Sequence, residues 1–202
     1  MKRDRQFRWR GLIGGLILFP LTVAVLFSQP LIIEGSWTDS LMDILAYAAF
    51  TIGAIFRLWS TVYIGGRKEK QVTCEGPYSI CRNPLYVGSL FLAVSAGLFF
   101  TSIVFAVGIG VTILFYMLAT IPSEEKFLGN IFGETYTEYC RKVPRFVPRF
   151  SLYHTAPTIQ VNVKALRGEF RRALIWIWIP VLGELIAQLR SQDWWPHLFR
   201  LL

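Results

Sequence analysis

Apolar runs of membrane-crossing length dominate this chain and most restrict what it can fold into. The hydrocarbon core of a bilayer is about 30 Å thick, so a helix needs about 20 apolar residues to cross it. Four runs meet this requirement with few charges: 11–33, 41–64, 85–100 and 103–121. A fifth run, 173–189, contains Glu184 and Gln188, so it either spans the bilayer or lies against its interface.

The composition agrees with a membrane protein. Hydrophobic residues make up 53% of the chain and the mean hydropathy is +0.45, which is too apolar for an ordinary soluble domain. We therefore predict an all-α, polytopic integral membrane protein with about five transmembrane helices, forming a single membrane domain over residues 1–202. Its parts are an N-terminal transmembrane hairpin (1–64), a core (65–150) that contains the helical hairpin 85–121, and an amphipathic segment with a C-terminal helix (151–202).

Basic residues lie beside these runs and predict the orientation. Five Lys or Arg residues fall in 1–10, four in 65–84 and nine in 122–172. Because such residues favour the cytoplasmic side, we expect the N-terminus and both loops there, in the inner or plasma membrane if the protein is bacterial. The net charge of +8 then suits anionic lipid headgroups, and we expect no nucleic-acid partner. The cysteines at positions 74, 81 and 140 fall on the same side, where free thiols are expected.

A short polar island, residues 75–88, separates the second and third runs. Gly76-Pro77 predicts a turn, because glycine permits unusual φ values and proline fixes φ. Asn83 and Pro84 predict a helix start, with asparagine as the N-cap and proline at the first helical position. The free N–H groups of that helix end suit an anionic group of a ligand.

A second polar cluster begins at Ser123 and includes Glu124 and Glu125. Only the apolar residues 85–121 lie between it and the island, and these 37 residues suffice for two crossings of the bilayer. A helical hairpin returns to the side that it left. We therefore expect the two clusters to meet at one membrane face, in a pocket that opens to the cytoplasm.

These residues, in this order, also resemble a known family. The chain is similar over about residues 50–150 to the isoprenylcysteine carboxyl methyltransferase and phospholipid methyltransferase family, whose members are integral membrane enzymes that use S-adenosylmethionine. Where some members have an arginine shortly before the paired glutamates, this chain has Ala119 to Ser123. The motifs that carry the resemblance are Gly76-Pro77-Tyr78, Arg82-Asn83-Pro84 with Tyr86 and Gly88, Glu124-Glu125, Phe132-Gly133, Tyr136, Tyr139 and Val143-Pro144-Arg145.

The resemblance implies an S-adenosylmethionine site, and the residues offer the groups that it needs. A carboxylate suits the ammonium, a guanidinium or helix N-terminus suits the carboxylate, and aromatic faces suit the sulfonium and adenine. We predict Arg82 and Glu125 as catalytic residues, and Arg57 and Arg145 as substrate-binding residues. No metal site is expected, since the two histidines, His154 and His197, lie far apart in the sequence. The predicted cofactor-binding residues are Tyr78, Arg82, Asn83, Pro84, Tyr86, Glu124, Glu125, Tyr136 and Tyr139.

Other interpretations stay open at this point. Glu124-Glu125 can instead be the acidic first turn of a helix capped by Ser123, and Arg57 can reach the interface along its own stem. The predicted activity is methyl transfer to a lipophilic acceptor, of an isoprenylcysteine carboxylate-like or phospholipid-like kind. The alternatives are a sterol-reductase-like, NADPH-dependent membrane oxidoreductase and a non-enzymatic membrane scaffold protein. The sequence does not fix the acceptor, the accepting atom or the oligomeric state.

Overall fold

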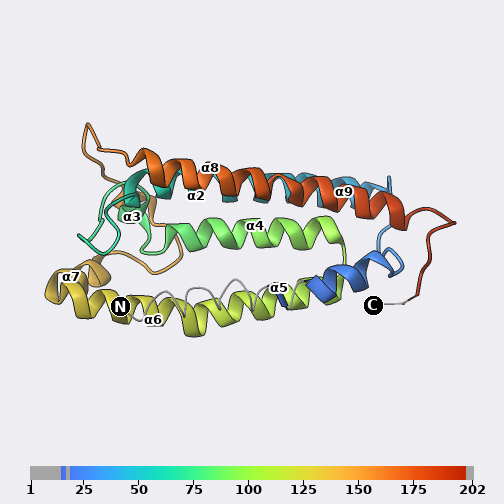
Figure 1. The fold of residues 1–202 in the computed structure, drawn as a ribbon, viewed down its shortest axis with the longest axis horizontal. Helices are drawn as coiled ribbons and strands as arrows, with labels where there is room; N and C mark the ends of the chain where they lie inside the picture. Colours follow the sequence, from blue (N-terminus) through green and yellow to red (C-terminus); the bar gives the residue numbers. More distant parts are fainter. Residues whose placement is uncertain (1–14, 17–18, 199–202) are drawn as a thin grey trace. The chain divides into compact units, whose positions relative to one another are not determined.

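The computed structural model describes residues 15–16 and 19–198, and within them it is helical with no strand, which confirms the all-α prediction. Residues 19–26 are helical, and the first predicted run lies partly outside the described residues. The elements that follow are shown in Figure 1: α2 (Trp37–Ile64), α3 (Pro77–Ile80), α4 (Pro84–Phe100), α5 (Ile103–Phe115), the π-helical turn η1 (Tyr116–Thr120), α6 (Ile121–Phe132), α7 (Glu134–Lys142), the short 3₁₀ turn η2 (Phe150–Leu152), α8 (Val163–Trp176) and α9 (Trp178–Arg190).

Three helical stretches of the described chain are long and apolar enough to cross a membrane: Trp37–Ile64, Ile103–Phe132 and Val163–Arg190. The helix Pro84–Phe100 is also apolar but has 17 residues, a length of about 25 Å. The count of five transmembrane helices therefore stays a prediction.

Two helices extend beyond the limits that hydropathy predicted. The fourth run continues as a helix to Phe132, so Ser123 does not cap a separate helix, and the interpretation that it does is wrong. Pro122 would disturb an ordinary helix, since it lacks an N–H and its ring crowds the preceding turn. The wider turn η1 ends at Thr120, two residues before it. The basic segment after Asn162 likewise joins the fifth run in one 28-residue stretch. Hydropathy locates the end of an apolar surface and not the end of a helix.

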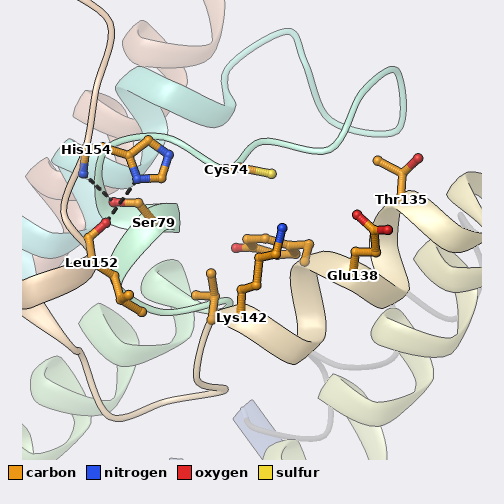
Figure 2. A pocket seen from close by; sticks show the side chains of 9 residues that line it. Cys74, Ser79, Thr135, Glu138, Lys142, Leu152 and His154 are labelled. Carbon is orange, nitrogen blue, oxygen red and sulfur yellow. Dashed lines mark hydrogen bonds between the residues drawn. The ribbon is translucent and has the colours of Figure 1, made fainter.

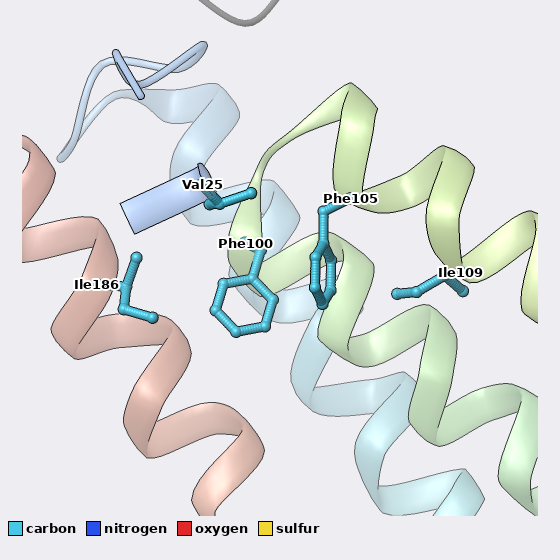
Figure 3. Packing of buried hydrophobic residues seen from close by; sticks show 5 residues of the cluster. All are labelled: Val25, Phe100, Phe105, Ile109 and Ile186. Carbon is cyan, nitrogen blue, oxygen red and sulfur yellow. The ribbon is translucent and has the colours of Figure 1, made fainter. Parts of the chain in front are cut away.

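The chain divides into two compact units, each described by itself. Unit 1 comprises residues 1–48, 93–116 and 179–202. Within its described part, Figure 3 shows an apolar cluster of Val25, Phe100, Phe105, Ile109 and Ile186.

One buried arginine also ties unit 1 together. The Arg190 guanidinium donates hydrogen bonds to the carbonyl oxygens of Ser28, Gln29 and Phe100 at 2.8 to 3.1 Å. Carbonyl groups at the ends of helical segments carry partial negative charge, so they stabilise this buried cation.

Unit 2 comprises residues 49–92 and 117–178 and contains every predicted site residue. Its helices approach closely at glycines. A Cβ on Gly88 would lie 2.8 Å from the Gly53 carbonyl oxygen and 2.6 Å from Arg57 Cγ, so α2 and α4 touch through their backbones. A Cβ on Gly65 would lie 3.0 Å from Ala165 Cβ, which places the end of α2 beside the start of α8, as Figure 1 shows. These contacts hold α2, α4 and α8 against one another.

Candidate functional site

The polar island folds as a turn, the short helix α3 and a corner that leads into α4. Gly76 has φ of +59°, and a Cβ there would lie 2.4 Å from the Tyr63 ring, so only glycine fits. The helix α4 begins at Pro84, as predicted. The carbonyl oxygen of Asn83 accepts the first helical hydrogen bonds, from the N–H groups of Tyr86 and Val87.

The predicted meeting of the two polar clusters is confirmed. The Asn83 side-chain amide donates to Glu125 Oε1 at 3.1 Å, and the Tyr86 hydroxyl donates to Glu124 Oε2 at 2.9 Å. Both bonds join the start of α4 to α6. Asn83 therefore uses its side chain to orient Glu125.

Glu125 lies between two arginines. Arg145 donates to its Oε2 through Nε at 3.0 Å and also through Nη2, and Arg82 Nη1 lies 3.6 Å from its Oε1. The hydrogen bond to Glu125 raises the pKa of Arg145. We call Arg82, Glu125 and Arg145 the corner cluster. Two guanidiniums share one carboxylate in it, which leaves one surplus positive charge.

One hydrogen-bond donor of Arg82 is without a partner. Its Nε is buried and has no hydrogen-bond partner, although a buried N–H normally has one. Its ion pair with Glu125 is also the longer of the two in this cluster. The corner cluster therefore suits an anionic group, which would pair with Arg82 and neutralise the surplus charge.

A strap of chain, residues 144–155, holds Arg145 over this corner. The Arg82 N–H donates to the Pro144 carbonyl oxygen at 2.8 Å, the Arg149 N–H to that of Ile80 at 2.9 Å, and the Gly76 N–H to that of His154 at 2.9 Å. Backbone bonds thus fix the strap along the island from Gly76 to Arg82.

The three predicted tyrosines of α3 and α7 are buried beside the corner. The Tyr139 hydroxyl donates to the Tyr78 carbonyl oxygen at 2.7 Å, and the rings of Tyr136 and Tyr139 lie 5.9 Å apart. Burial raises the pKa of all three phenols well above the usual range. They stay neutral and offer aromatic faces and not charge.

Arg57 does not join the corner cluster. It binds Glu169 of α8, through Nε at 2.9 Å and Nη2 at 2.7 Å, and donates through Nη1 to Ser89 of α4. The Glu169 side chain is 1% exposed and also pairs with Arg172, while the Trp176 ring lies 4.6 Å from Arg57 Cζ. We call Arg57, Glu169 and Arg172 the helix-α8 cluster.

Sequence reasoning missed Glu169. The sequence predicts an amphipathic segment here but does not single out Glu169, which is buried, while Val163 and Phe170 are exposed. An ionisable residue among apolar ones in a bilayer-crossing helix usually faces the protein interior, as Glu169 does, whereas Lys164, Arg167 and Arg171 of the same helix are exposed. The available signal was a lone acidic residue within a strongly basic segment.

Nine residues line a cavity of about 410 Å³, among them Ser79, Glu138 and His154, which Figure 2 labels. Among the predicted cofactor residues, only Tyr139 lines it. The remaining lining includes Cys74, Ser79, Glu138, Lys142 and His154. Within the described residues, no group of three His, Cys, Asp or Glu side chains could hold a metal ion.

A family model for phospholipid methyltransferases matches residues 24–135, more than half of the chain. The chain belongs to the phospholipid methyltransferase family. The matched region contains Arg57, the corner from Arg82 to Tyr86, and both glutamates of α6. Arg145 of the strap and Glu169 of α8 lie outside it. Membership of this family, together with the three apolar helices, identifies a membrane protein.

Similar proteins of known name fall into two groups. The chain is 31% identical over 151 residues to the cobalt-zinc-cadmium resistance protein CzcN of Cupriavidus metallidurans, covering 75% of this chain and 69% of that protein. It is 28% identical over 163 residues to the nickel-cobalt-cadmium resistance protein NccN of Alcaligenes xylosoxydans, with coverages of 81% and 76%. Protein-S-isoprenylcysteine O-methyltransferase B of Arabidopsis thaliana is 31% identical over 87 residues, 43% of this chain and 44% of that protein. No solved structure matches the chain.

Proposed function

We propose that the protein is an S-adenosylmethionine-dependent membrane methyltransferase that acts on a lipophilic acceptor, of an isoprenylcysteine carboxylate-like or phospholipid-like kind. The observation that carries the proposal is the corner cluster at the start of α4, with its surplus positive charge and its buried, unpartnered Arg82 Nε. The family favours this activity over a sterol-reductase-like oxidoreductase or a scaffold protein.

The residues around the corner cluster suit the individual chemical groups of S-adenosylmethionine. Arg82 and the α4 N-terminus would hold its carboxylate. The ammonium would gain little at Glu125, whose charge two arginines already share, so we assign it to the neighbouring Glu124. Tyr136, Tyr139 and Tyr78 would face the sulfonium and adenine.

When bound, S-adenosylmethionine supplies an electrophilic methyl group for a one-step displacement. The protein then mainly aligns the two reactants and excludes water. The strap and the buried tyrosines shield the corner from solvent, and Glu125 orients Arg82, Asn83 and Arg145 around the donor. Glu125 would act here through its partners, as a positioning residue, and its predicted catalytic role stays a prediction.

The acceptor would enter from the bilayer and the donor from the cytoplasm. The basic loops beside the corner support a cytoplasmic site in an inner or plasma membrane, with anionic lipid headgroups as neighbours. Arg145, half exposed at the rim, would contact the acceptor at the surface.

Calorimetric titration of the purified protein with S-adenosylmethionine and with NADPH tests the proposal. We expect micromolar binding of S-adenosylmethionine and no binding of NADPH. Binding of NADPH alone would replace the proposal by the oxidoreductase, and binding of neither would favour the scaffold protein.

A further inference from the structure

The helix-α8 cluster buries two opposite charges in the interior of unit 2. Arg57 is 17% exposed and Glu169 is 1% exposed, whereas Arg172 is 61% exposed. Replacing a buried ion pair by apolar residues is often neutral or stabilising, so stability alone does not account for it. Ionisable residues within membrane-spanning helices usually mark a functional path.

The cluster lies deeper than the corner cluster along the same helix. Ser89, the α4 partner of Arg57, follows Asn83 by six residues, about 9 Å along a helix. The end of α2 lies beside the start of α8. Arg57 precedes that end of α2 by seven residues, and Glu169 follows that start of α8 by six, so each lies about 10 Å along its helix from this point. The neighbouring Leu174 and Ile175 are exposed and would face lipid.

The charges resemble those of the corner cluster. One carboxylate serves two guanidiniums, so one positive charge is in surplus. If the ion pair between Glu169 and Arg57 breaks, Glu169 still has a cationic partner, because Arg172 remains bound to its other oxygen. The Trp176 ring and Ser89 would keep the Arg57 guanidinium oriented during that exchange.

We infer that Glu169 is a built-in counter-anion of Arg57, exchanged for an anionic group of a chain-bearing acceptor. A carboxylate or phosphate head would bind Arg57, and its chain would extend into the bilayer past α8. The inference rests on the proposed function, because it takes the ligand to be the methyl acceptor. It assigns selectivity for anionic head groups to α8, a helix outside the residues that the family model matches.

Binding of dodecanoate and dodecyl phosphate to the full chain in a non-ionic detergent tests the inference. The comparison probes are dodecanol, which has the chain without the charge, and acetate and inorganic phosphate, which have the charge without the chain. We expect only the two chain-bearing anions to bind. Equal affinity for dodecanol, or for inorganic phosphate, would overturn the inference.

Variants then test the exchange itself. In Glu169→Gln, Arg57 has no competing carboxylate, so the affinity for dodecanoate should rise about tenfold, and the ligand should raise the Tm more than in the wild type. In Arg172→Gln, Glu169 has Arg57 as its one remaining cationic partner, so the affinity should fall about threefold. Arg57→Gln should abolish binding. Glu184→Gln, on α9 of the same long stretch, is the matched control and should change nothing.

A merely structural ion network would lower the Tm in these variants and leave dodecanoate affinity unchanged, which would overturn the inference. If Glu169→Gln does not fold, the dodecanoate affinity of Arg172→Gln still tests the inference. The fluorescence of Trp176, isolated by subtracting the signal of a Trp176→Phe variant, then reports binding at the cluster. Titration of the same preparations with S-adenosylmethionine separates the two proposals. Donor binding without dodecanoate binding removes only this inference, and dodecanoate binding without donor binding removes only the proposed methyl donor.

Discussion

The corner cluster and the helix-α8 cluster share one composition, a glutamate between two arginines, but differ in how far their hydrogen bonds are satisfied. In the corner cluster Arg82 keeps a buried N–H without a partner, and its ion pair with Glu125 is long. In the helix-α8 cluster each guanidinium nitrogen of Arg57 has a partner, and Glu169 is nearly inaccessible. The first arrangement suits a ligand that adds to it, and the second suits a ligand that replaces part of it.

The largest expected effect is on stability, at the more buried glutamate. Glu169→Ala leaves Arg57 as an uncompensated buried charge and should lower the free energy of unfolding by about 3–5 kcal/mol. Glu125→Ala should cost less, because the Glu125 side chain is 10% exposed, against 1% for Glu169, so water can more easily solvate the arginines that it leaves behind. Denaturant titration of both variants measures the difference, and an equal loss would show that the two clusters are equally buried.

The next effect tests how well the corner excludes solvent. Burial raises the pKa of the Cys81 thiol, directly before Arg82, to about 12. The thiol therefore stays protonated until the pH approaches that value, and at pH 9 its thiolate fraction, on which modification by iodoacetamide depends, should be roughly 1,000-fold below that of a free cysteine. Mass spectrometry of labelled peptides over pH 7–11 measures this, and rapid modification at pH 8 would show that the corner opens.

Donor affinity should distinguish the two clusters directly. Arg82→Gln removes the proposed partner of the donor carboxylate and should weaken S-adenosylmethionine binding at least tenfold, about 1.4 kcal/mol. Arg57→Gln should leave this affinity within about twofold, since Arg57 belongs to the other cluster. Calorimetry measures both, with Arg141→Gln on the exposed face of α7 as the control. A tenfold loss in Arg57→Gln and none in Arg82→Gln would reverse our assignment.

The smallest effects come from single hydroxyl groups on one face of α4. Tyr86→Phe removes the bond to Glu124 and should weaken donor binding about threefold. Ser89→Ala removes the bond to Arg57 and should lower the free energy of unfolding by about 1 kcal/mol without changing donor affinity. If both variants alter donor binding alike, the two clusters act as one site.

The sequence predicted the corner because its evidence is local. Asn83-Pro84 marks a helix start whatever the rest of the chain does, and a hairpin of two crossings returns Glu124 and Glu125 to that start. The chemistry of the donor then selected Arg82 and the tyrosines. Their roles stay predictions, although the structure brings the residues together.

The helix-α8 cluster could not be predicted in the same way. Arg57 and Glu169 are 112 residues apart in the sequence, and their pairing depends on which face of α8 turns inward. Hydropathy cannot settle that face, because lipid outside a membrane protein is as apolar as its interior. The close approach of α2 and α4 at Gly53 and Gly88 was equally invisible, since it requires the partner of each glycine to be known.

The strap has a consequence for how such a protein can vary. The strap contributes backbone atoms to its bonds with Gly76, Ser79, Ile80, Arg82 and Asn83 of the island, so these bonds tolerate most exchanges of side chain along residues 144–155. Mutations there could remodel the rim that an incoming molecule meets while leaving the position of the chain intact. Arg149→Pro would be an exception, because proline has no N–H to donate to the Ile80 carbonyl oxygen.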